Sequence, residues 1–151
     1  MINFDSVDDI LDFAIKGEEE AHGFYMDLAQ NMERPSMRKV FEDFAREELG
    51  HKKKLIGIKT GTIGKTGGKK VPDLKIGDYL VDIEPYPGMD YQEALIVAMK
   101  KEKAAFKMYS DLATAMDDES LSTLFLDLAQ EEAKHKLRFE IEYDEQILTE
   151  N

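Results

Sequence analysis

The sequence contains no cysteine and only four prolines among its 151 residues. Without cysteine the chain forms neither disulfides nor thiolate-bound zinc or iron–sulfur sites, so a bound metal must be held by carboxylates and imidazoles. No stretch approaches the roughly 18 consecutive apolar residues of a membrane span. The N-terminal segment "MINFDSVDDILDF" also lacks the basic start and the continuous apolar run of a signal peptide, so we expect a cytoplasmic protein.

Positive charge is also scarce in this sequence. The chain has 20 Lys and Arg against 32 Asp and Glu, which gives a formal net charge of -12. This charge argues against nucleic acid and against an anionic membrane as partners, because both surfaces would repel the protein. With 42% hydrophobic and 34% charged residues the composition is typical of a helical globular protein, and the length predicts one domain over residues 1–151.

Apolar residues recur at helical spacing in four segments of the chain. The first two segments are separated by only a few residues, which predicts an antiparallel helical hairpin over residues 6–56. The last two segments predict a second hairpin over residues 90–148. Asp90 and Glu93 have the spacing of a capping box and are expected to open the first helix of that hairpin.

Residues 57–89 interrupt the helical pattern with most of the glycines of the chain and three of its four prolines. We predict a long crossover connection here. Its segment "LKIGDYLVDI" is rich in β-branched and aromatic residues and is expected to lie extended along the helices. Together the segments predict an all-α four-helix bundle, built from two helical hairpins that the crossover joins.

The second hairpin repeats the first at a constant offset of 84 residues, with no gap. Tyr25 returns as Tyr109, and the pair Glu48 and His51 in "AREELGH" returns as a glutamate and a histidine in "AQEEAKH". Two hairpins that repeat in this way are expected to pack about a pseudo-twofold axis.

Polar residues interrupt the apolar stripe of every predicted helix. A buried carboxylate costs several kcal/mol, so four of them in one core require compensation. Two divalent metals would balance four carboxylate charges, and carboxylate with neutral imidazole suits iron or manganese. The Glu-x-x-His spacing places both side chains on one helix face, where they can reach one metal cluster. The predicted metal ligands are Glu18, Glu48, His51, Glu102, Glu132 and His135.

This pattern resembles the rubrerythrin branch of the ferritin-like di-iron carboxylate proteins, in which two helices supply one glutamate each and two supply Glu-x-x-His. The resemblance covers about residues 8 to 145 and implies a ferritin-like bundle that binds two iron ions, with manganese as the alternative. Classical members carry an additional glutamate where this chain has Ala105, so we expect a symmetric site of six ligands. They also carry a cysteine-rich rubredoxin domain, for which these 151 residues have no cysteines.

The resemblance also implies a role for each site residue. Two glutamates would bridge the metals, and the other two would each terminate one metal together with a histidine. The tyrosines look like the hydrogen-bond donors of the family to the ligand carboxylates, and we counted them as candidate catalytic residues. The bridging pair is Glu48 and Glu132, the terminal pairs are Glu18 with His51 and Glu102 with His135, and the tyrosines are Tyr25 and Tyr109.

Three further polar residues near the stripes are expected to have other roles. His22 lies off the stripe, and its repeat partner is Phe106, so we interpret it as a packing or surface histidine. Glu47 and Glu131 precede the bridging glutamates. They are expected on a solvated face, with support of the metal ligands as the alternative.

The resulting hypothesis is a non-haem di-iron oxidoreductase that reduces hydrogen peroxide or dioxygen while ferrous iron is oxidised. Its electrons would come from an external donor protein such as a rubredoxin. Three alternatives stay open: a dimanganese catalase, an iron-binding or storage protein, and a structural bundle with a vestigial site. Few residues follow the fourth helix, which favours a homodimer over a ferritin-like cage.

Overall fold

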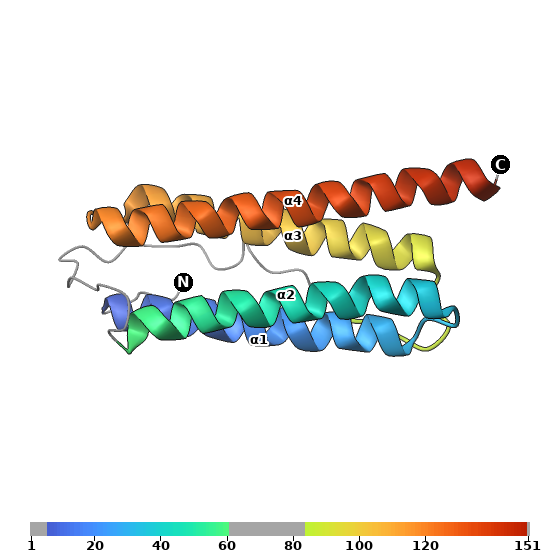
Figure 1. Cartoon of the computed structure of the whole chain (residues 1–151), viewed down its shortest axis with the longest axis horizontal. Coiled ribbons are helices and arrows are strands. Elements are labelled where there is room, and N and C mark those ends of the chain that lie inside the picture. The colour runs from blue at the N-terminus through green and yellow to red at the C-terminus, as the bar shows by residue number, and fades with distance from the viewer. Residues whose placement is uncertain (1–5, 61–83, 151) are drawn as a thin grey trace.

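A computed structural model of the protein describes residues 6–60 and 84–150, with side chains described up to residue 146. The described chain consists of four α-helices with no strand between them, and the prediction of an all-α four-helix bundle is confirmed (Figure 1). The helices are α1 (Val7–Gln30), α2 (Pro35–Lys59), α3 (Tyr91–Ala115) and α4 (Glu119–Glu150). The segment predicted to be extended, residues 74–83, lies outside the described residues.

Short polar residues and a proline mark where the helices begin. The side chain of Ser6 accepts a hydrogen bond from the backbone N–H of Asp9 at 3.2 Å, and α2 begins at Pro35. Asp90 caps α3 by accepting from the N–H of Gln92 at 3.1 Å. The other half of the predicted capping box is used differently, because the Glu93 carboxylate accepts a hydrogen bond from the hydroxyl of Tyr86.

The first hairpin extends further than predicted. Residues 57–59 belong to α2, although we had assigned them to the crossover. The reason is burial: Leu55 and Ile58 are one helical turn apart and are 0% and 1% exposed, so the apolar stripe continues past Gly57. The helix ends at Thr60, whose backbone N–H bonds to the carbonyl of Ile56.

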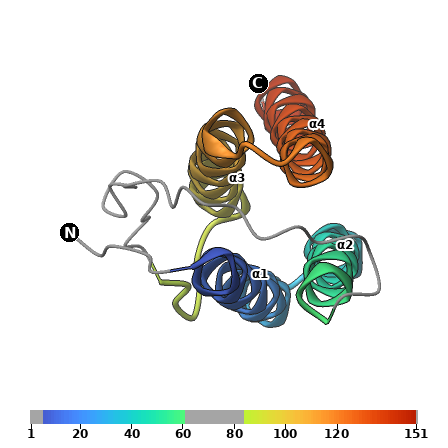
Figure 2. The same ribbon diagram turned by 90° about the vertical axis from the view of Figure 1, so that its left-hand side faces the viewer.

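The two hairpins lie against each other along the bundle. Within each hairpin the helices are antiparallel, whereas α2 and α3 run in the same direction, and Lys59 and Tyr91 lie at opposite ends of the bundle (Figure 1). An end-on view places α1 beside α3 and α2 beside α4 (Figure 2). The repeated hairpins with one long crossover are therefore confirmed.

Two apolar clusters fill the two ends of the bundle. Both combine residues from all four helices, so each ties one hairpin to the other. The first apolar cluster comprises Val7, Ile10, Leu11, Ala14, Leu55, Ile58, Met108, Tyr109, Leu112, Ala113, Met116, Leu121, Phe125, Leu128 and Ala129. The second comprises Phe24, Tyr25, Leu28, Ala29, Met32, Phe41, Phe44, Ala45, Met89, Tyr91, Ala94, Leu95, Val97, Ala98 and Phe139.

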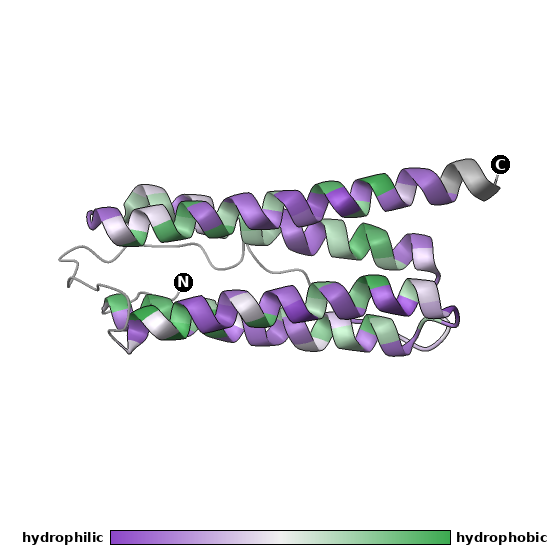
Figure 3. Cartoon of the chain, in the orientation of Figure 1, coloured by the Kyte–Doolittle hydropathy of each residue, from purple (hydrophilic) through white to green (hydrophobic). Residues whose placement is uncertain are grey.

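Hydrophobic and hydrophilic residues alternate along the helices (Figure 3). In the part of the chain that the structure describes, no helix has the length and apolar character needed to span a membrane. On every helix, the positions between the two apolar clusters are where the polar stripe residues lie.

Candidate metal centre

Six buried polar residues form a layer between the two apolar clusters. All six predicted ligand residues lie in it, and none is more than 5% exposed. We call this group the polar layer: Glu18 on α1, Glu48 and His51 on α2, Glu102 on α3, and Glu132 and His135 on α4.

The polar layer contains two overlapping groups of four residues. In each group, every residue offers one oxygen or nitrogen atom, and these atoms lie within 4.8 Å of one another. The two groups share the same two carboxylates, Glu48 and Glu132. The first group adds Glu18 and His51, and the second adds Glu102 and His135. The offset of 84 residues converts one group into the other, as the expected pseudo-twofold axis requires.

Both imidazole rings direct Nδ1 towards the carboxylates. Nδ1 of His51 lies 2.8 Å from Oε1 of Glu132, and Nδ1 of His135 lies 3.2 Å from Oε1 of Glu48. The two rings are nearly parallel, with centroids 5.6 Å apart and an angle of 8° between their planes. Each histidine therefore approaches a carboxylate that belongs to the opposite hairpin.

The hydrogen-bonding capacity of the polar layer is largely unused. Among the described residues, every buried side-chain oxygen or nitrogen without a hydrogen-bond partner belongs to these six residues. Such atoms are rare in folded proteins, because losing water without gaining a partner costs free energy. Oxygen and imidazole nitrogen atoms that converge in this way match the ligands of iron or manganese, so the cluster can bind a pair of such metals.

Burial and mutual repulsion perturb the carboxylates of the layer. Burial, followed by the charge of Glu18, raises the pKa of Glu48 well above its usual range. Burial and the charge of Glu102 do the same to the pKa of Glu132. The pKa of Glu18 is lowered, since its contacts with Glu48 and His51 outweigh the opposing effect of burial. A cation between the shared carboxylates would relieve the repulsion that raises these two pKa values.

Two buried tyrosines connect the polar layer across the hairpins. The hydroxyl of Tyr25 on α1 donates to Oε1 of Glu102 on α3, and the hydroxyl of Tyr109 on α3 donates to Oε1 of Glu18 on α1. Burial raises the pKa of both phenols well above 10, and the nearby carboxylate charges add to this, so both stay protonated donors. Donation to ligand carboxylates is thus observed, and a catalytic role stays a prediction.

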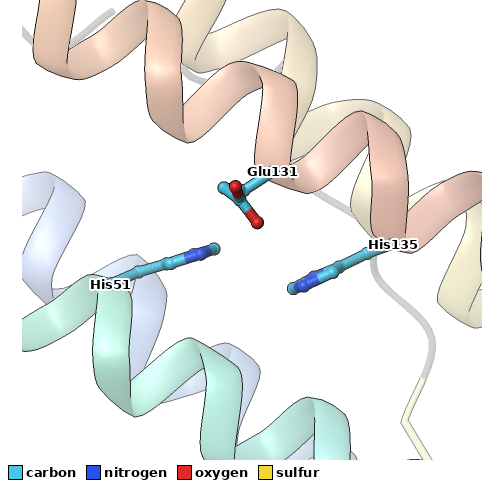
Figure 4. A group of neighbouring side chains, drawn as sticks. All are labelled: His51, Glu131 and His135. Atoms are coloured by element: carbon cyan, nitrogen blue, oxygen red, sulfur yellow. The ribbon is translucent and has the colours of Figure 1, made fainter.

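A further group of residues lies at the outer edge of the layer, where α2 faces α4. Glu131 lies close to the rings of both His51 and His135, and these three residues also offer ligand atoms within 4.8 Å of one another (Figure 4). Glu47 approaches His135 from the same edge, with Oε2 3.0 Å from Nε2. Glu47 was expected on a solvated face; its side chain is 44% exposed, yet it contacts a predicted ligand.

Sequence reasoning missed one residue at this edge. Arg138 donates a hydrogen bond to Oε2 of Glu47 at 3.4 Å, and its guanidinium lies 4.5 Å from the centre of the Phe44 ring. The only signal in the sequence was its position one helical turn after His135. His22 packs as expected, half-buried with Nδ1 3.0 Å from the carbonyl oxygen of Ala45.

Comparison with known proteins supports the geometry. No curated protein matches the chain. Among solved structures it is similar to a hypothetical protein from Pyrococcus furiosus, with 27% identity, a TM-score of 0.68 and coverage of 93% of this chain and 89% of the other. It is also similar to an uncharacterised conserved protein from Magnetospirillum magnetotacticum, with 24% identity, a TM-score of 0.73 and coverage of 92% and 94%. The family model of rubrerythrin matches residues 9–76 and 93–151, so the chain belongs to the rubrerythrin family.

Proposed function

We propose that the protein is a non-haem di-iron oxidoreductase that reduces hydrogen peroxide or dioxygen as ferrous iron is oxidised. The observation that carries this proposal is the pair of four-residue groups that share Glu48 and Glu132. Shared carboxylates between two terminal sets are the arrangement that a dinuclear centre needs. Membership of the rubrerythrin family supports the same function.

The polar layer supplies a symmetric ligand set in this proposal. Glu48 and Glu132 would bridge the two metals, because both carboxylates belong to both groups. The terminal ligands would be Glu18 with His51 on one metal and Glu102 with His135 on the other. Two bound ferrous ions would supply the two electrons that, with two protons, convert hydrogen peroxide into two molecules of water.

The protein residues around the layer would orient the ligands and limit access of water. Tyr25 and Tyr109 each hold one oxygen of a terminal carboxylate, which leaves the second oxygen of that carboxylate for a metal. Phe44 packs edge-on against the His135 ring, with centroids 4.9 Å apart, and so restricts the rotation of that imidazole. The two apolar clusters close both ends of the layer to solvent.

The proposal includes an external electron donor, such as a rubredoxin, because the chain has no cysteine with which to hold an electron-transfer iron. It also places the protein in the cytoplasm as a homodimer. Large apolar side chains on the outside of α4 support the dimer, since Leu126, Leu137 and Ile141 are 49%, 55% and 50% exposed.

Anaerobic loading with ferrous iron tests the proposal. We expect two iron ions per chain, fast oxidation by added hydrogen peroxide, and repeated turnover once a reductant is present. Iron content, the absorbance of the ferric product and peroxide consumption are the quantities to measure. Less than one iron per chain would contradict the proposal. Peroxide consumption by the manganese-loaded protein without reductant would favour a dimanganese catalase, and iron uptake far above two per chain would favour storage.

A further inference from the structure

We infer that Glu47, held by Arg138, is a positioning residue that fixes the orientation and the tautomer of His135 as a metal ligand. This inference rests on the proposed dinuclear centre. It concerns a carboxylate at the exposed edge of the site, outside the six ligands, and gives it a specific task.

The geometry of the His135 ring separates an inner nitrogen from an outer one. Nδ1 faces the polar layer, 3.2 Å from Oε1 of Glu48 and 3.6 Å from Oε2 of Glu102. Nε2 faces the other way and lies 3.0 Å from Oε2 of Glu47. The ring is 2% exposed, so water cannot easily replace this outer partner.

A carboxylate at the outer nitrogen determines which nitrogen carries the proton. Glu47 can only accept a hydrogen bond while it is ionised, so it stabilises the ring with hydrogen on Nε2. Nδ1 then keeps its lone pair for a metal, and the hydrogen bond makes it a stronger ligand. Loss of the carboxylate would leave both the ring orientation and the proton position less restricted.

Glu47 is itself held in place, although its side chain is 44% exposed. Arg138 donates to the same oxygen, Oε2, at 3.4 Å. The Arg138 guanidinium in turn lies over the Phe44 ring at 4.5 Å, and Phe44 packs against His135. These contacts form a closed ring of four residues on α2 and α4 around the outer nitrogen.

The repeat makes the two halves unequal at this position. Glu131 is the counterpart of Glu47 and lies near His51, but its partner is Lys134, at 3.5 Å along the same helix. The repeat places Lys54 where the second half has Arg138. The anchored carboxylate is therefore particular to the His135 side.

The test uses the full-length protein with Zn2+, a diamagnetic metal that binds to carboxylate and imidazole. We would compare Glu47→Ala and Glu47→Gln with wild type and with Glu42→Ala, an exposed glutamate on the same helix. Calorimetric titration gives the metal affinity. Nitrogen-15 spectra of the imidazoles, of which the chain has only three, report which nitrogen carries hydrogen and how fast that hydrogen exchanges.

We expect Glu47→Ala to weaken the affinity of one of the two metal positions by about 10- to 100-fold and to remove the protected Nε2–H signal of His135. Glu47→Gln keeps a neutral acceptor and should lie between wild type and Glu47→Ala. The His22 signal should persist in every variant, because its Nδ1 contacts the Ala45 carbonyl instead. Glu42→Ala should match wild type.

Two results would overturn the inference while the dinuclear centre stands. One is a Glu47→Ala protein with the affinity and the His135 signal of wild type. The other is slower metal uptake with unchanged final affinity, which would make Glu47 a guide for incoming cations. If wild type itself binds no metal, the proposed function fails, and that outcome is recognised before any variant is compared.

Discussion

At the scale of single residues, the polar layer shows why burial and chemistry must be considered together. Glu48 and Glu132 lie where the apolar stripe of their helices predicts hydrophobic residues, and they are 2% and 0% exposed. Their raised pKa values express the cost of keeping carboxylates there. The tyrosine hydroxyls reduce that cost for the two terminal carboxylates, each from the opposite hairpin.

Tyr25→Phe tests the hydroxyl separately from the ring. The variant keeps the packing of the second apolar cluster but removes the donor to Oε1 of Glu102. We expect metal affinity to fall by about 10- to 100-fold, because a ligand carboxylate loses the contact that orients it. Calorimetric titration measures the change. Tyr86→Phe is the control, since Tyr86 is exposed and donates to Glu93, away from the layer; equal affinities in the two variants would argue against the orienting role.

At the scale of elements, each helix combines an apolar stripe with one interruption at the polar layer. Helix α4 carries the largest share of the connections between the hairpins on its inner face. Its residue Phe139 is fully buried, with ring centroids 4.1 Å from Phe44 and 5.8 Å from Tyr25. The one clear boundary error, at residues 57–59, arose at Gly57, where a glycine suggested a helix end and burial of the next apolar residue overrode it.

Phe139→Ala should lower the free energy of unfolding by about 3–5 kcal/mol, because the cavity lies between aromatic rings of three helices and cannot collapse easily. Denaturant unfolding followed by circular dichroism measures the loss. Leu137→Ala on the same helix is the matched control, since Leu137 is 55% exposed, and its change should stay within about 0.5 kcal/mol. Similar losses in both variants would show that the core does not extend to this part of α4.

At the scale of the whole molecule, the fold holds two apolar clusters apart with a layer of acid and imidazole. The chain already carries a formal net charge of -12, so four further carboxylates in the interior are costly to the metal-free protein. The family, the repeat and the shared carboxylates agree that this cost serves metal binding. Stability and metal binding are therefore coupled in this protein.

Replacing both shared carboxylates, in Glu48→Leu/Glu132→Leu, tests this coupling. The metal-free variant should be more stable than metal-free wild type by about 1–4 kcal/mol, because apolar side chains of similar volume replace buried acids. It should also lose metal binding and peroxide consumption. Unfolding in the presence of a chelator and calorimetric titration measure the two effects. Glu42→Leu on the exposed face of α2 is the control, and a double variant that is less stable than wild type would contradict the argument.

The sequence alone determined the four helices, their pairing into two hairpins, the repeat and the six polar residues of the layer. These properties follow from local rules, since helical periodicity decides which residues share a face, and an offset of 84 residues needs no coordinates. Only the tertiary structure decided which residues meet across the hairpins. Tyr25 lies seven residues after Glu18, yet it donates to Glu102, because two helical turns separate it from Glu18 by about 10 Å along the axis. The contact of Glu47 with His135 likewise joins α2 to α4, and such contacts depend on how the helices pack rather than on the spacing within either helix.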